Sequence, residues 1–581
     1  MDVLTNLRDK IISVVKILED QEIIAPGINK DSIAVETPKD DSFGDLSSNV
    51  AMVLSKKASL NPRELAQYFV DQFAEDSIIE TVEVAGPGFL NFRLKNNLWF
   101  KVVVAILEAG TSFGLKKVGK GKTVNIEFVS ANPTGPLHVG HTRGAVFGDV
   151  LANLLDAAGY TVTREYYVND AGSQIDSLAR SVFSRYQEAL GLPTNSDQNE
   201  YPGDYLREIG DLLKDEYSDL LLTRDEISRL DTIKEFTVEK ILTSIRRDLA
   251  DLGIVMDSFI SEKDLYKRGK VEESVNHLRD LGLIYKGVLE KPKGGVEQEW
   301  LAREQELFKS SQFGDDIDRP IKKADGTWTY FAPDIAYHYD KLSRSYDEII
   351  DVFGADHSGY SARMKAVVKA FSGGKKDLTV KLCQLVKLYK EGRPVKMSKR
   401  AGTYVTLRDL LNEVGKDAVR FLLLMRKNDA PIDFDFSKAI EQTRENPVFY
   451  VQYANARICS VFRRAEESKV NVSDSSLSKV DLSQLKNDSE IQVIRKLAEW
   501  PSVITKATSR FEPHRVAFYL FEVAQLFHSL QSLGKMDHDL RFLRKDDLNL
   551  TKARLAMVRS IQVVIQSGLN IFGIEPMDEM L

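Results

Sequence analysis

Cysteine is scarce in this chain, and a long hydrophobic run is missing. Only Cys383 and Cys459 occur among 581 residues, too few for a disulfide framework or a cysteine-rich zinc site, and this usage suits a reducing cytosol. No apolar run approaches the length of a membrane span, and the first ten residues carry acids without the apolar core of a secretory signal. We therefore expect a cytoplasmic protein with no membrane partner.

Solenoid repeats, long low-complexity tracts and a positive net charge are missing too. The formal net charge is −7, which argues against indiscriminate binding to nucleic acids but leaves room for a local basic face. One basic stretch runs from Lys387 to Arg400 and contains a single acid, Glu391. By itself this stretch is as consistent with a solvated surface as with a binding loop.

The length and a composition of 43% hydrophobic residues predict several domains with buried cores. We expect a small α+β domain over residues 1–115, a catalytic domain with insertions over 116–445 and an all-helical domain over 446–581. Apolar residues recur at helical spacing from Val3 to Leu18, and a strand–turn–strand pattern spans 81–94.

The pattern of the middle domain predicts a Rossmann-like parallel sheet, and therefore the α/β class. Residues 123–129 alternate like a strand, a helical pattern follows from 138 to 158, and 161–168 read as the next strand. A strand–helix–strand unit of this kind implies parallel strands. Further strands are expected at 348–353 and 378–386.

Two histidines stand where the first strand turns into the helix. His138 and His141 share one helix face near the N-terminal end, where unpaired N–H groups and partial positive charge favour phosphate. Imidazoles there can stabilise a phosphoryl oxygen as charge develops. Gly140, Gly144 and Gly148 form a stripe without side chains, which suggests close approach of a nucleotide ring or a strand.

Two other interpretations of the histidines stay open on the residues alone. They could be zinc ligands, but no cysteine or carboxylate lies nearby at metal-site spacing. They could also be ordinary surface residues with satisfied hydrogen bonds. The glycine stripe and the strand–turn–helix setting favour the phosphate site.

A second cationic motif lies far downstream, after Gly392-Arg-Pro. It comprises Lys396, Met397, Ser398, Lys399 and Arg400. Lysine ammoniums on a loop can close over the β- and γ-phosphates of ATP and stabilise the leaving pyrophosphate. The motif is short, so its weight comes from its pairing with the histidines.

Together the two motifs resemble the HIGH and KMSKS signatures of class I aminoacyl-tRNA synthetases, and the surrounding sequence is similar to the arginyl-tRNA synthetase family of the bacterial type. The matching segments are 132–149, 164–172, 330–338, 354–360, 446–454 and 571–576. They span nearly the whole chain. The departures are small: the first motif reads His-Val-Gly-His, the second ends in Arg400, and Leu581 follows the terminal methionine.

The resemblance implies a ligase that activates arginine with ATP to arginyl-adenylate and then charges the 2′-hydroxyl of the terminal adenosine of tRNA(Arg), releasing AMP and pyrophosphate. Magnesium would enter only as the partner of the ATP phosphates, with no tightly bound cofactor. By resemblance, catalysis belongs to His138, His141, Lys396 and Lys399. ATP binding belongs to Gly140, Gly144, Asp356, His357, Met397 and Ser398.

An arginine side chain is a planar, permanently charged fork of donors, so a selective pocket needs carboxylates at its base. By resemblance the amino acid contacts Glu127, Ser130, Asn132, Tyr330 and Asp334. The residues alone leave an alternative open, because Asp334 could cap a helix after Pro333 and Tyr330 could be a core aromatic.

The helical domain carries a candidate RNA face. Tyr450, Tyr453 and Arg457 lie three and then four residues apart, so one helix face would hold two rings and a guanidinium, which suit single-stranded bases. The same pattern also predicts an aromatic core stripe. By resemblance this domain reads the anticodon with that face and Met580, and the N-terminal domain touches the elbow of the tRNA.

Two other functions compete with a tRNA ligase. A small-molecule adenylyltransferase would share the histidine motif but would be shorter and lack the helical domain. An inactive RNA-binding relative would be expected to have damaged phosphate-contacting residues, whereas both histidines and both lysines are intact. No dedicated metal site or coiled-coil seam is visible, and we expect a monomer.

Overall fold

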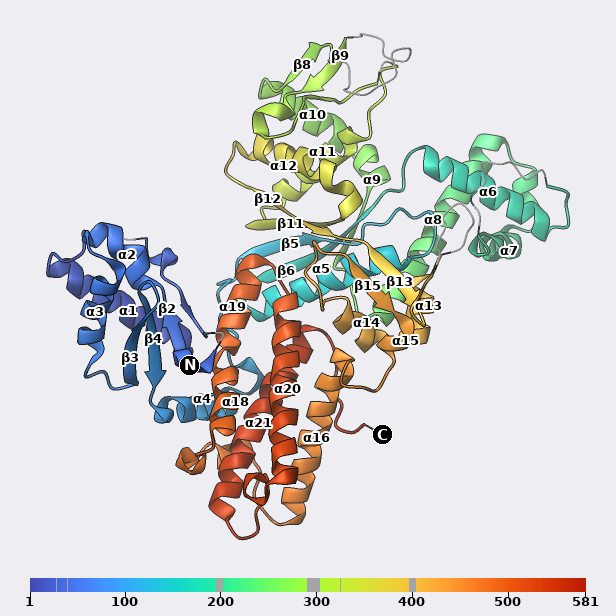
Figure 1. The fold of residues 1–581 in the computed structure, drawn as a ribbon. Helices are drawn as coiled ribbons and strands as arrows, with labels where there is room; N and C mark the ends of the chain where they lie inside the picture. Colours follow the sequence, from blue (N-terminus) through green and yellow to red (C-terminus); the bar gives the residue numbers. More distant parts are fainter. Residues whose placement is uncertain are drawn as a thin grey trace. The chain divides into compact units, whose positions relative to one another are not determined.

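The computed structural model describes residues 1–27, 29–38, 40–194, 201, 203–289, 304–323, 325–395 and 404–580. The chain forms two compact units, coloured along the sequence in Figure 1. One unit is the continuous stretch Lys117–Glu441. The other joins Met1–Lys116 to Gln442–Leu581.

A five-stranded parallel sheet, in the order β12-β11-β5-β6-β7, is the centre of the Lys117–Glu441 unit. Its strands are β5 (Thr123–Glu127), β6 (Thr161–Val168), β7 (Ser258–Ser261), β11 (Glu348–Gly354) and β12 (Leu378–Cys383). Helix α5 (Val139–Ala157) links β5 to β6, and α12 (Ser358–Ser372) links β11 to β12. Because such crossovers are right-handed, these helices cover opposite faces of the sheet. The predicted Rossmann-like α/β class is confirmed.

The sheet is buried by apolar side chains, as parallel sheets are. Ile349 of β11 and Leu378 of β12 pack with Met364, Val367 and Val368 of α12 in one buried cluster. On β5, Val124 and Ile126 are 1% and 0% exposed. The polar ends of the strands are therefore held on a rigid base.

Long insertions separate the strands of this unit. Between β6 and β11 come helices α6 (Ser173–Ala189), α7 (Tyr205–Tyr217), η4 (Leu220–Leu222), α8 (Glu226–Asp251), α9 (Glu262–Lys267), α10 (Lys270–Asp280) and α11 (Phe331–Ser343). A small antiparallel sheet, order β10-β9-β8, lies among them and comprises β8 (Ile284–Gly287), β9 (Gln305–Phe308) and β10 (Arg319–Pro320), with η5 (Ser310–Phe313) between the last two. The sequence pattern did not predict this small sheet.

The last part of the unit holds a second small sheet, order β14-β13-β15. Its strands are β13 (Val386–Lys390), β14 (Arg393–Pro394) and β15 (Ile432–Asp435). Short helices accompany them: η6 (Ala355–His357), α13 (Leu407–Val414), α14 (Lys416–Leu422) and α15 (Phe436–Ala439). The guanidinium of buried Arg143 on α5 donates to the carbonyl oxygens of Gln384, Lys427 and Ala430 at 2.7–2.9 Å, and so fixes α5 to this segment.

The N-terminal part of the other unit is a four-stranded antiparallel sheet, order β1-β2-β4-β3, packed with helices. Its strands are β1 (Val35–Glu36), β2 (Leu46–Ser48), β3 (Ile79–Ala85) and β4 (Phe89–Leu94), and its helical elements are α1 (Val3–Asp20), η1 (Lys30–Ser32), η2 (Asp41–Phe43), α2 (Val50–Ala58), α3 (Pro62–Phe73), α4 (Asn96–Ala109) and η3 (Gly110–Ser112). The predicted hairpin is present as β3 and β4. Helix α3 begins with a capping box between Asn61 and Glu64.

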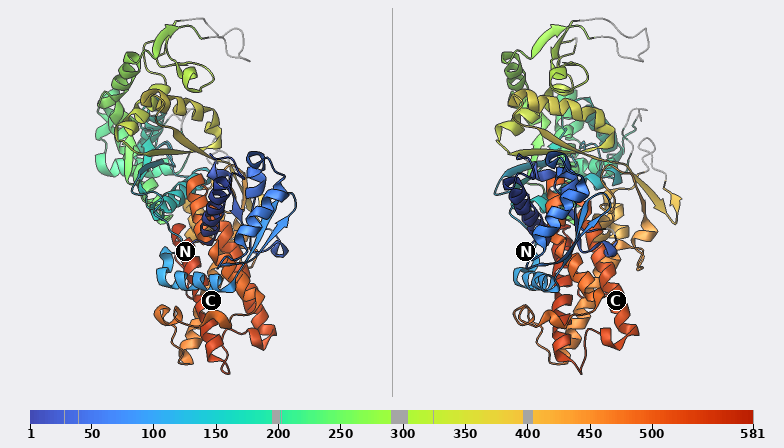
Figure 2. Two further views of the ribbon diagram at one scale, coloured as in Figure 1. Left: turned by 90° about the vertical axis from the view of Figure 1, so that its left-hand side faces the viewer. Right: turned by 60° about the vertical axis from the view of Figure 1, so that its left-hand side comes forward.

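The C-terminal part of that unit is helical, as predicted, and its orange-to-red helices run side by side in both views of Figure 2. The elements are α16 (Pro447–Glu467), α17 (Asp474–Leu477), η7 (Leu482–Gln484), α18 (Asp488–Ala498), α19 (Trp500–Arg510), α20 (His514–Met536), η8 (His538–Leu540) and α21 (Leu548–Ile571). The polar segment 473–483 contains α17 and the start of η7, where Leu477 and Leu482 are buried.

Candidate active site

The chain reverses direction across the central sheet between β5 and β11. From β5 the strands proceed outward through β6 to β7, and the chain then returns to add β11 on the other side of β5. In open α/β sheets, ligands bind at the carboxyl ends of the strands at such a switch point. The residues that follow β5 and β11 are therefore the candidates for the site.

The histidine motif forms the N-terminal cap of α5. His138 is the N-cap residue, and its Nδ1 accepts a hydrogen bond from the backbone N–H of Gly140 at 3.1 Å. The backbone N–H of His138 donates to Nδ1 of His141 at 3.3 Å, which completes a reciprocal capping box. The two rings stack with their centroids 3.9 Å apart. Both imidazoles thus lie at the positive end of a long helix.

The three glycines of α5 have different surroundings. A Cβ on Gly148 would come within 2.3 Å of the Phe128 side chain, and one on Gly140 would come within 2.9 Å of the His138 ring. A Cβ on Gly144 would meet nothing within 4 Å. Close packing therefore explains two of the glycines, while the position of Gly144 leaves space for another molecule.

The segment after the lysine motif pairs with the histidine motif. His138 and Thr406 form an antiparallel bridge, with the N–H of Val139 donating to the Val405 carbonyl oxygen at 3.2 Å and the N–H of Leu407 donating to that of Leu137 at 2.8 Å. The ring of Tyr404 lies edge-on to the His138 ring, with centroids 5.9 Å apart.

The predicted residues Lys396, Met397, Ser398 and Lys399 lie outside the described residues. The chain is described up to Val395, whose N–H donates to the Leu388 carbonyl oxygen at 2.9 Å, and again from Tyr404. From Tyr404 onward the chain therefore lies beside the imidazoles.

The loop after β5 holds its backbone in an uncommon conformation. Val129 has φ +69° and Ser130 has φ +37°, values that cost energy for residues with a side chain, above all for a β-branched valine. The Ser130 hydroxyl donates to Glu127 Oε1 at 2.8 Å and accepts from the Tyr167 N–H at 3.0 Å. These bonds hold the turn and bring Ser130 against Glu127.

Glu127 is buried at the carboxyl end of β5 beside a lysine. Its Oε2 accepts from Lys341 Nζ at 2.5 Å, and Lys341 also donates to Asp351 Oδ1 at 2.7 Å. Burial raises the pKa of Glu127, and the Lys341 ammonium opposes that rise. Burial also favours the neutral form of Asp351, but Lys341 and His338 lower its pKa to about 2.

Asp334 lies in the first turn of α11, half-buried, and accepts a hydrogen bond from the Tyr360 hydroxyl. Burial raises the pKa of Asp334 to about 6, against the effect of that hydrogen bond. No Lys or Arg within the described ranges forms an ion pair with this carboxylate. The Asp334 carboxylate can therefore form an ion pair with a cationic ligand.

A second acid at this position was missed by the sequence analysis. Glu262, 8% exposed, accepts from the Tyr167 hydroxyl at 3.0 Å, and burial together with Asp334 raises its pKa to about 7. The Tyr167 ring in turn stacks on Tyr337 with centroids 4.4 Å apart. Glu262 directly follows β7, and a residue in that position of a parallel sheet is a candidate for ligand binding. Because the sequence analysis did not predict this short strand, it did not identify Glu262. Two carboxylates and aromatic rings together form a suitable site for a guanidinium.

The other predicted amino-acid contacts are at the surface. Tyr330 is the N-cap of α11; the residue is 73% exposed, and Lys323 Nζ lies 5.6 Å from its ring centroid. Asn132 is exposed, and its side-chain amide donates to Gln174 Oε1 at 3.1 Å. Neither residue belongs to the buried group around Glu127.

Asp356 and His357 follow β11 in η6, at the carboxyl edge of the sheet. Both side chains are exposed, and His357 Nε2 lies 3.7 Å from Asp356 Oδ2. Their place beside the switch point is the one expected for residues that contact a nucleotide or amino acid.

The predicted RNA residues form a half-buried cluster on α16. The guanidinium of Arg457 lies 4.0 Å from the Tyr453 ring centroid and donates to the Tyr453 hydroxyl and to Gln531 Oε1, each at 2.7 Å. His528 Nε2 lies 3.1 Å from the Tyr450 carbonyl oxygen, and burial together with Arg457 lowers the pKa of His528 to about 4. These rings are not a fully buried core stripe.

The C-terminal tail lies along the same helix. Gln452 donates to the Glu575 carbonyl oxygen and accepts from the Met577 N–H, both at 2.9 Å, and Asn455 donates to the Met577 carbonyl oxygen at 2.9 Å. Met580 follows this anchored stretch and is half-buried.

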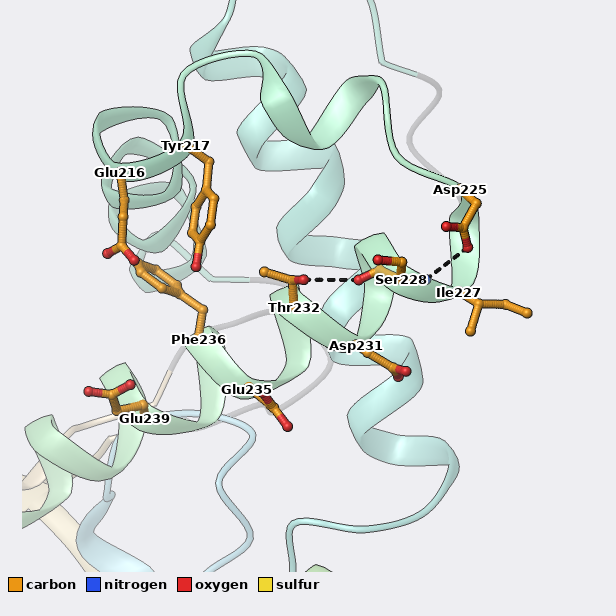
Figure 3. A pocket seen from close by; sticks show the side chains of 10 residues that line it. All are labelled: Glu216, Tyr217, Asp225, Ile227, Ser228, Asp231, Thr232, Glu235, Phe236 and Glu239. Atoms are coloured by element: carbon orange, nitrogen blue, oxygen red, sulfur yellow. Dashed lines mark hydrogen bonds between the residues drawn. The ribbon is translucent and has the colours of Figure 1, made fainter.

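A recess of about 700 Å³ between α7 and α8 is a separate feature (Figure 3). Its lining includes the acids Glu216, Asp225, Asp231, Glu235 and Glu239 and no lysine or arginine. Such a surface repels phosphate groups, so the recess does not suit ATP or RNA. It contains none of the predicted site residues.

Among the described residues, no three or more histidine, cysteine, aspartate or glutamate side chains are grouped so as to hold a metal ion. Within the same residues, no helix is both long and apolar enough to cross a bilayer.

Family models match three consecutive parts of the chain. Residues 102–442 match the class I (R) tRNA synthetase catalytic domain, residues 5–94 match the arginyl-tRNA synthetase N-terminal domain, and residues 451–580 match the DALR anticodon-binding domain. The arginine–tRNA ligase of Ruegeria pomeroyi is 52% identical over 580 residues, which is 100% of each chain.

Solved structures of arginyl-tRNA synthetases are similar to this chain in fold. One from Campylobacter jejuni, described as an arginyl-tRNA synthetase, is 30% identical with a TM-score of 0.72, covering 84% of this chain and 100% of that one. The arginyl-tRNA synthetase of Thermus thermophilus shares the fold, with a TM-score of 0.72, 19% identity and coverage of 99% and 100%. A class I catalytic domain with a parallel sheet, a histidine-capped helix and full-length similarity to arginine–tRNA ligases establish that this chain belongs to the arginyl-tRNA synthetase family.

Proposed function

We propose that the protein joins arginine to tRNA(Arg) at the crevice between β5 and β11. ATP activates the arginine carboxylate to arginyl-adenylate with release of pyrophosphate. The 2′-hydroxyl of the terminal adenosine then attacks the adenylate carbonyl and releases AMP. The observation that supports the proposal is the bridge between His138 and Thr406, because it brings the chain just downstream of the lysine motif to the helix end that carries the histidines.

In this proposal the triphosphate of ATP lies at the N-terminal end of α5. His138 and His141 stabilise the charge that develops on the α-phosphoryl oxygens, and the helix end adds its partial positive charge. Gly144 leaves space for the nucleotide. Lys396 and Lys399 stabilise the leaving pyrophosphate. The remaining proposed ATP contacts are Gly140, Asp356, His357, Met397 and Ser398.

The arginine is proposed to extend between two acidic positions. Asp334 and Glu262 receive the guanidinium, since neither the half-buried Asp334 nor the buried Glu262 forms an ion pair with a lysine or arginine within the described ranges. Glu127, with Ser130 beside it, receives the α-ammonium. Asn132 and the exposed Tyr330 lie outside that buried group and are proposed to contact the amino acid from the surface.

The RNA is proposed to bind both parts of the other unit. Residues 446–581 read the anticodon through Tyr450, Tyr453, Arg457 and Met580, and residues 1–115 contact the elbow. The half-buried rings on α16 suit base stacking, which supports this role. Residues 116–445 form the catalytic domain in this scheme.

Magnesium is proposed to enter with the ATP phosphates, and no other cofactor is required. We further propose that the enzyme acts as a monomer in the cytoplasm. The unpaired thiols of Cys383 and Cys459 support a reducing compartment.

The deciding experiment is aminoacylation of a mixed tRNA pool with each of the twenty amino acids. We expect stable charging with arginine alone and only of tRNA(Arg). Arginine-dependent exchange of pyrophosphate into ATP, measured with and without the tRNA, then separates activation from transfer. Charging with another amino acid, or no charging despite an intact fold, contradicts the proposal.

A further inference from the structure

Four ionisable side chains form one buried network behind the arginine site. Glu127 and Asp351 come from adjacent strands, and His338 and Lys341 come from α11. Their exposed fractions are 4%, 0%, 2% and 0%, respectively. Burying charges is costly unless each finds a partner, so such a network requires an explanation.

The hydrogen bonds indicate two anions and two cations. His338 Nε2 lies 3.0 Å from Asp351 Oδ2, and its Nδ1 lies 2.9 Å from the Asp334 carbonyl oxygen. Both partners are acceptors, so both ring nitrogens must donate, which makes His338 an imidazolium. Although burial opposes that charge, Asp351 raises the pKa of His338. With Lys341, the network is neutral overall.

Helix α11 connects the two ends of the proposed arginine site through this network. Asp334, His338 and Lys341 are four and then three residues apart, so they lie on one face of α11. The contacts run from the Asp334 carbonyl through His338, Asp351 and Lys341 to Glu127. The acid at the guanidinium end and the acid at the ammonium end are thus fixed relative to each other.

Lys341 also favours the ionised form of Glu127. Oε1 of Glu127 accepts from Ser130 and Oε2 accepts from Lys341, so one donor occupies each oxygen and further lone pairs stay available. Without the ammonium, burial and the nearby Asp351 carboxylate favour the protonated acid. A neutral acid in that position attracts an ammonium far less.

We propose that Lys341 is a positioning residue for arginine: it holds Glu127 ionised and oriented so that Glu127 can receive the α-ammonium, and with His338 it fixes the spacing between Glu127 and Asp334. Lys341 itself is fully buried and acts through Glu127. This inference rests on the proposed arginine–tRNA ligase function.

The experiment is the Lys341→Met variant, which keeps much of the volume and removes the charge. We expect the KM for arginine in tRNA charging to rise about 10- to 100-fold near pH 7.5, with a smaller change in the KM for ATP. Raising the pH should lower the KM for arginine part of the way back, as Glu127 ionises.

The ionisable groups that face Glu127 are Lys341, His338, Asp334 and Tyr337 of α11, Asp351 of β11 and Tyr167 of β6.

Arg344→Met provides the matched control. Arg344 is the C-cap residue of α11 and donates to both oxygens of Glu165, a fully buried carboxylate on β6 that none of the proposed substrate contacts includes. Its loss should lower the melting temperature without raising the KM for arginine or changing its pH dependence.

Two more variants separate positioning from folding. Lys341→Arg keeps the positive charge, so its KM for arginine should lie much closer to that of the unaltered enzyme than to that of Lys341→Met. The double variant Lys341→Met with Asp351→Asn restores charge balance, so it should regain stability but keep the raised KM. The inference is overturned if the double variant regains normal arginine KM, or if Lys341→Met and Arg344→Met behave alike. Failure of the unaltered protein to charge arginine would instead overturn the proposed function.

Discussion

At the scale of single residues, the most informative feature is a pair of acids that form no ion pair with a lysine or arginine within the described ranges. Asp334 and Glu262 are surrounded by Tyr167, Tyr266 and Tyr360, and burial raises the pKa of each acid. A protein gains little stability from such groups, because burial penalises their charged forms. In the proposed function, the guanidinium of arginine supplies the missing charge.

Replacing Asp334 by Asn should affect arginine and not ATP. The variant keeps the shape of the side chain and its contact with Tyr360 but removes the negative charge. We expect the KM for arginine to rise roughly 100-fold, or about 2.7 kcal/mol, because one partner of a buried charge pair is lost. Steady-state charging with arginine and ATP varied in turn measures this. An equal rise in both KM values contradicts the assignment.

The same two acids should make arginine binding depend on pH. Both must be ionised to bind a guanidinium, and their pKa values are about 6 and about 7. The KM for arginine should therefore rise as the pH falls below about 7. Replacing Glu262 by Gln should remove the upper part of this dependence, and an unchanged profile in that variant argues against a role for Glu262.

The raised pKa values also set the direction of the stability change. Because the folded protein binds more protons than the unfolded chain from the ordinary carboxyl pKa values of 3.8 and 4.5 up to about 7, the free enzyme should lose stability as the pH rises through that window. Saturating arginine should offset this loss above pH 7, where both acids are ionised. Melting temperatures with and without arginine across the window measure both effects.

At the scale of elements, α5 shows how glycines in one helix serve different purposes. Gly148 allows Phe128, just beyond β5, to approach the helix, so it is needed for packing. Gly144 faces open space and costs helix stability without a packing reason. The difference separates a structural glycine from a candidate for ligand approach.

Alanine substitutions in α5 should therefore have opposite effects on stability. Gly144→Ala should stabilise the free enzyme by up to about 1 kcal/mol while raising the KM for ATP several-fold. Gly148→Ala should destabilise it by about 1–3 kcal/mol, because the added methyl overlaps Phe128. Urea unfolding and ATP-dependent charging measure the two effects. A stable Gly144→Ala enzyme with unchanged ATP kinetics removes Gly144 from the nucleotide site.

At the scale of the whole molecule, the proposed sites for arginine and for the anticodon belong to different units. The acids and imidazoles belong to Lys117–Glu441, and the α16 cluster belongs to the unit that joins the two ends of the chain. Changes in one cluster should therefore affect one substrate selectively.

Arg457→Gln should raise the KM for tRNA about tenfold and leave the KM for arginine unchanged, since it removes a guanidinium that lies on the Tyr453 ring. Arg559→Gln is the matched control, because its guanidinium lies 4.4 Å from the Phe462 ring centroid in the same helical unit but outside the proposed RNA face. Charging at varied tRNA concentration measures both. Equal effects of the two substitutions indicate a general change in the helical unit.

Local patterns in the sequence predicted the fold class, because hydrophobic periodicity and capping residues act over a few positions. They also indicated Asp334 as an acid that could cap a helix, while its proposed arginine contact came from the family resemblance. Among the strands that were not predicted, β7, β8 and β13 have two to four buried or half-buried positions each. So few positions do not distinguish a strand from a loop. Missing β7 also concealed Glu262.

The sequence by itself determined the chemistry available to this protein: two imidazoles at a helix start, a lysine-rich segment, acids for arginine and a helical C-terminal domain. Only the tertiary structure decided which of these groups meet. The bridge from His138 to Thr406 spans more than half of the Lys117–Glu441 unit, and Lys341 reaches Glu127 across 214 positions. Contacts of this kind depend on the order of strands in a sheet, which no local pattern encodes.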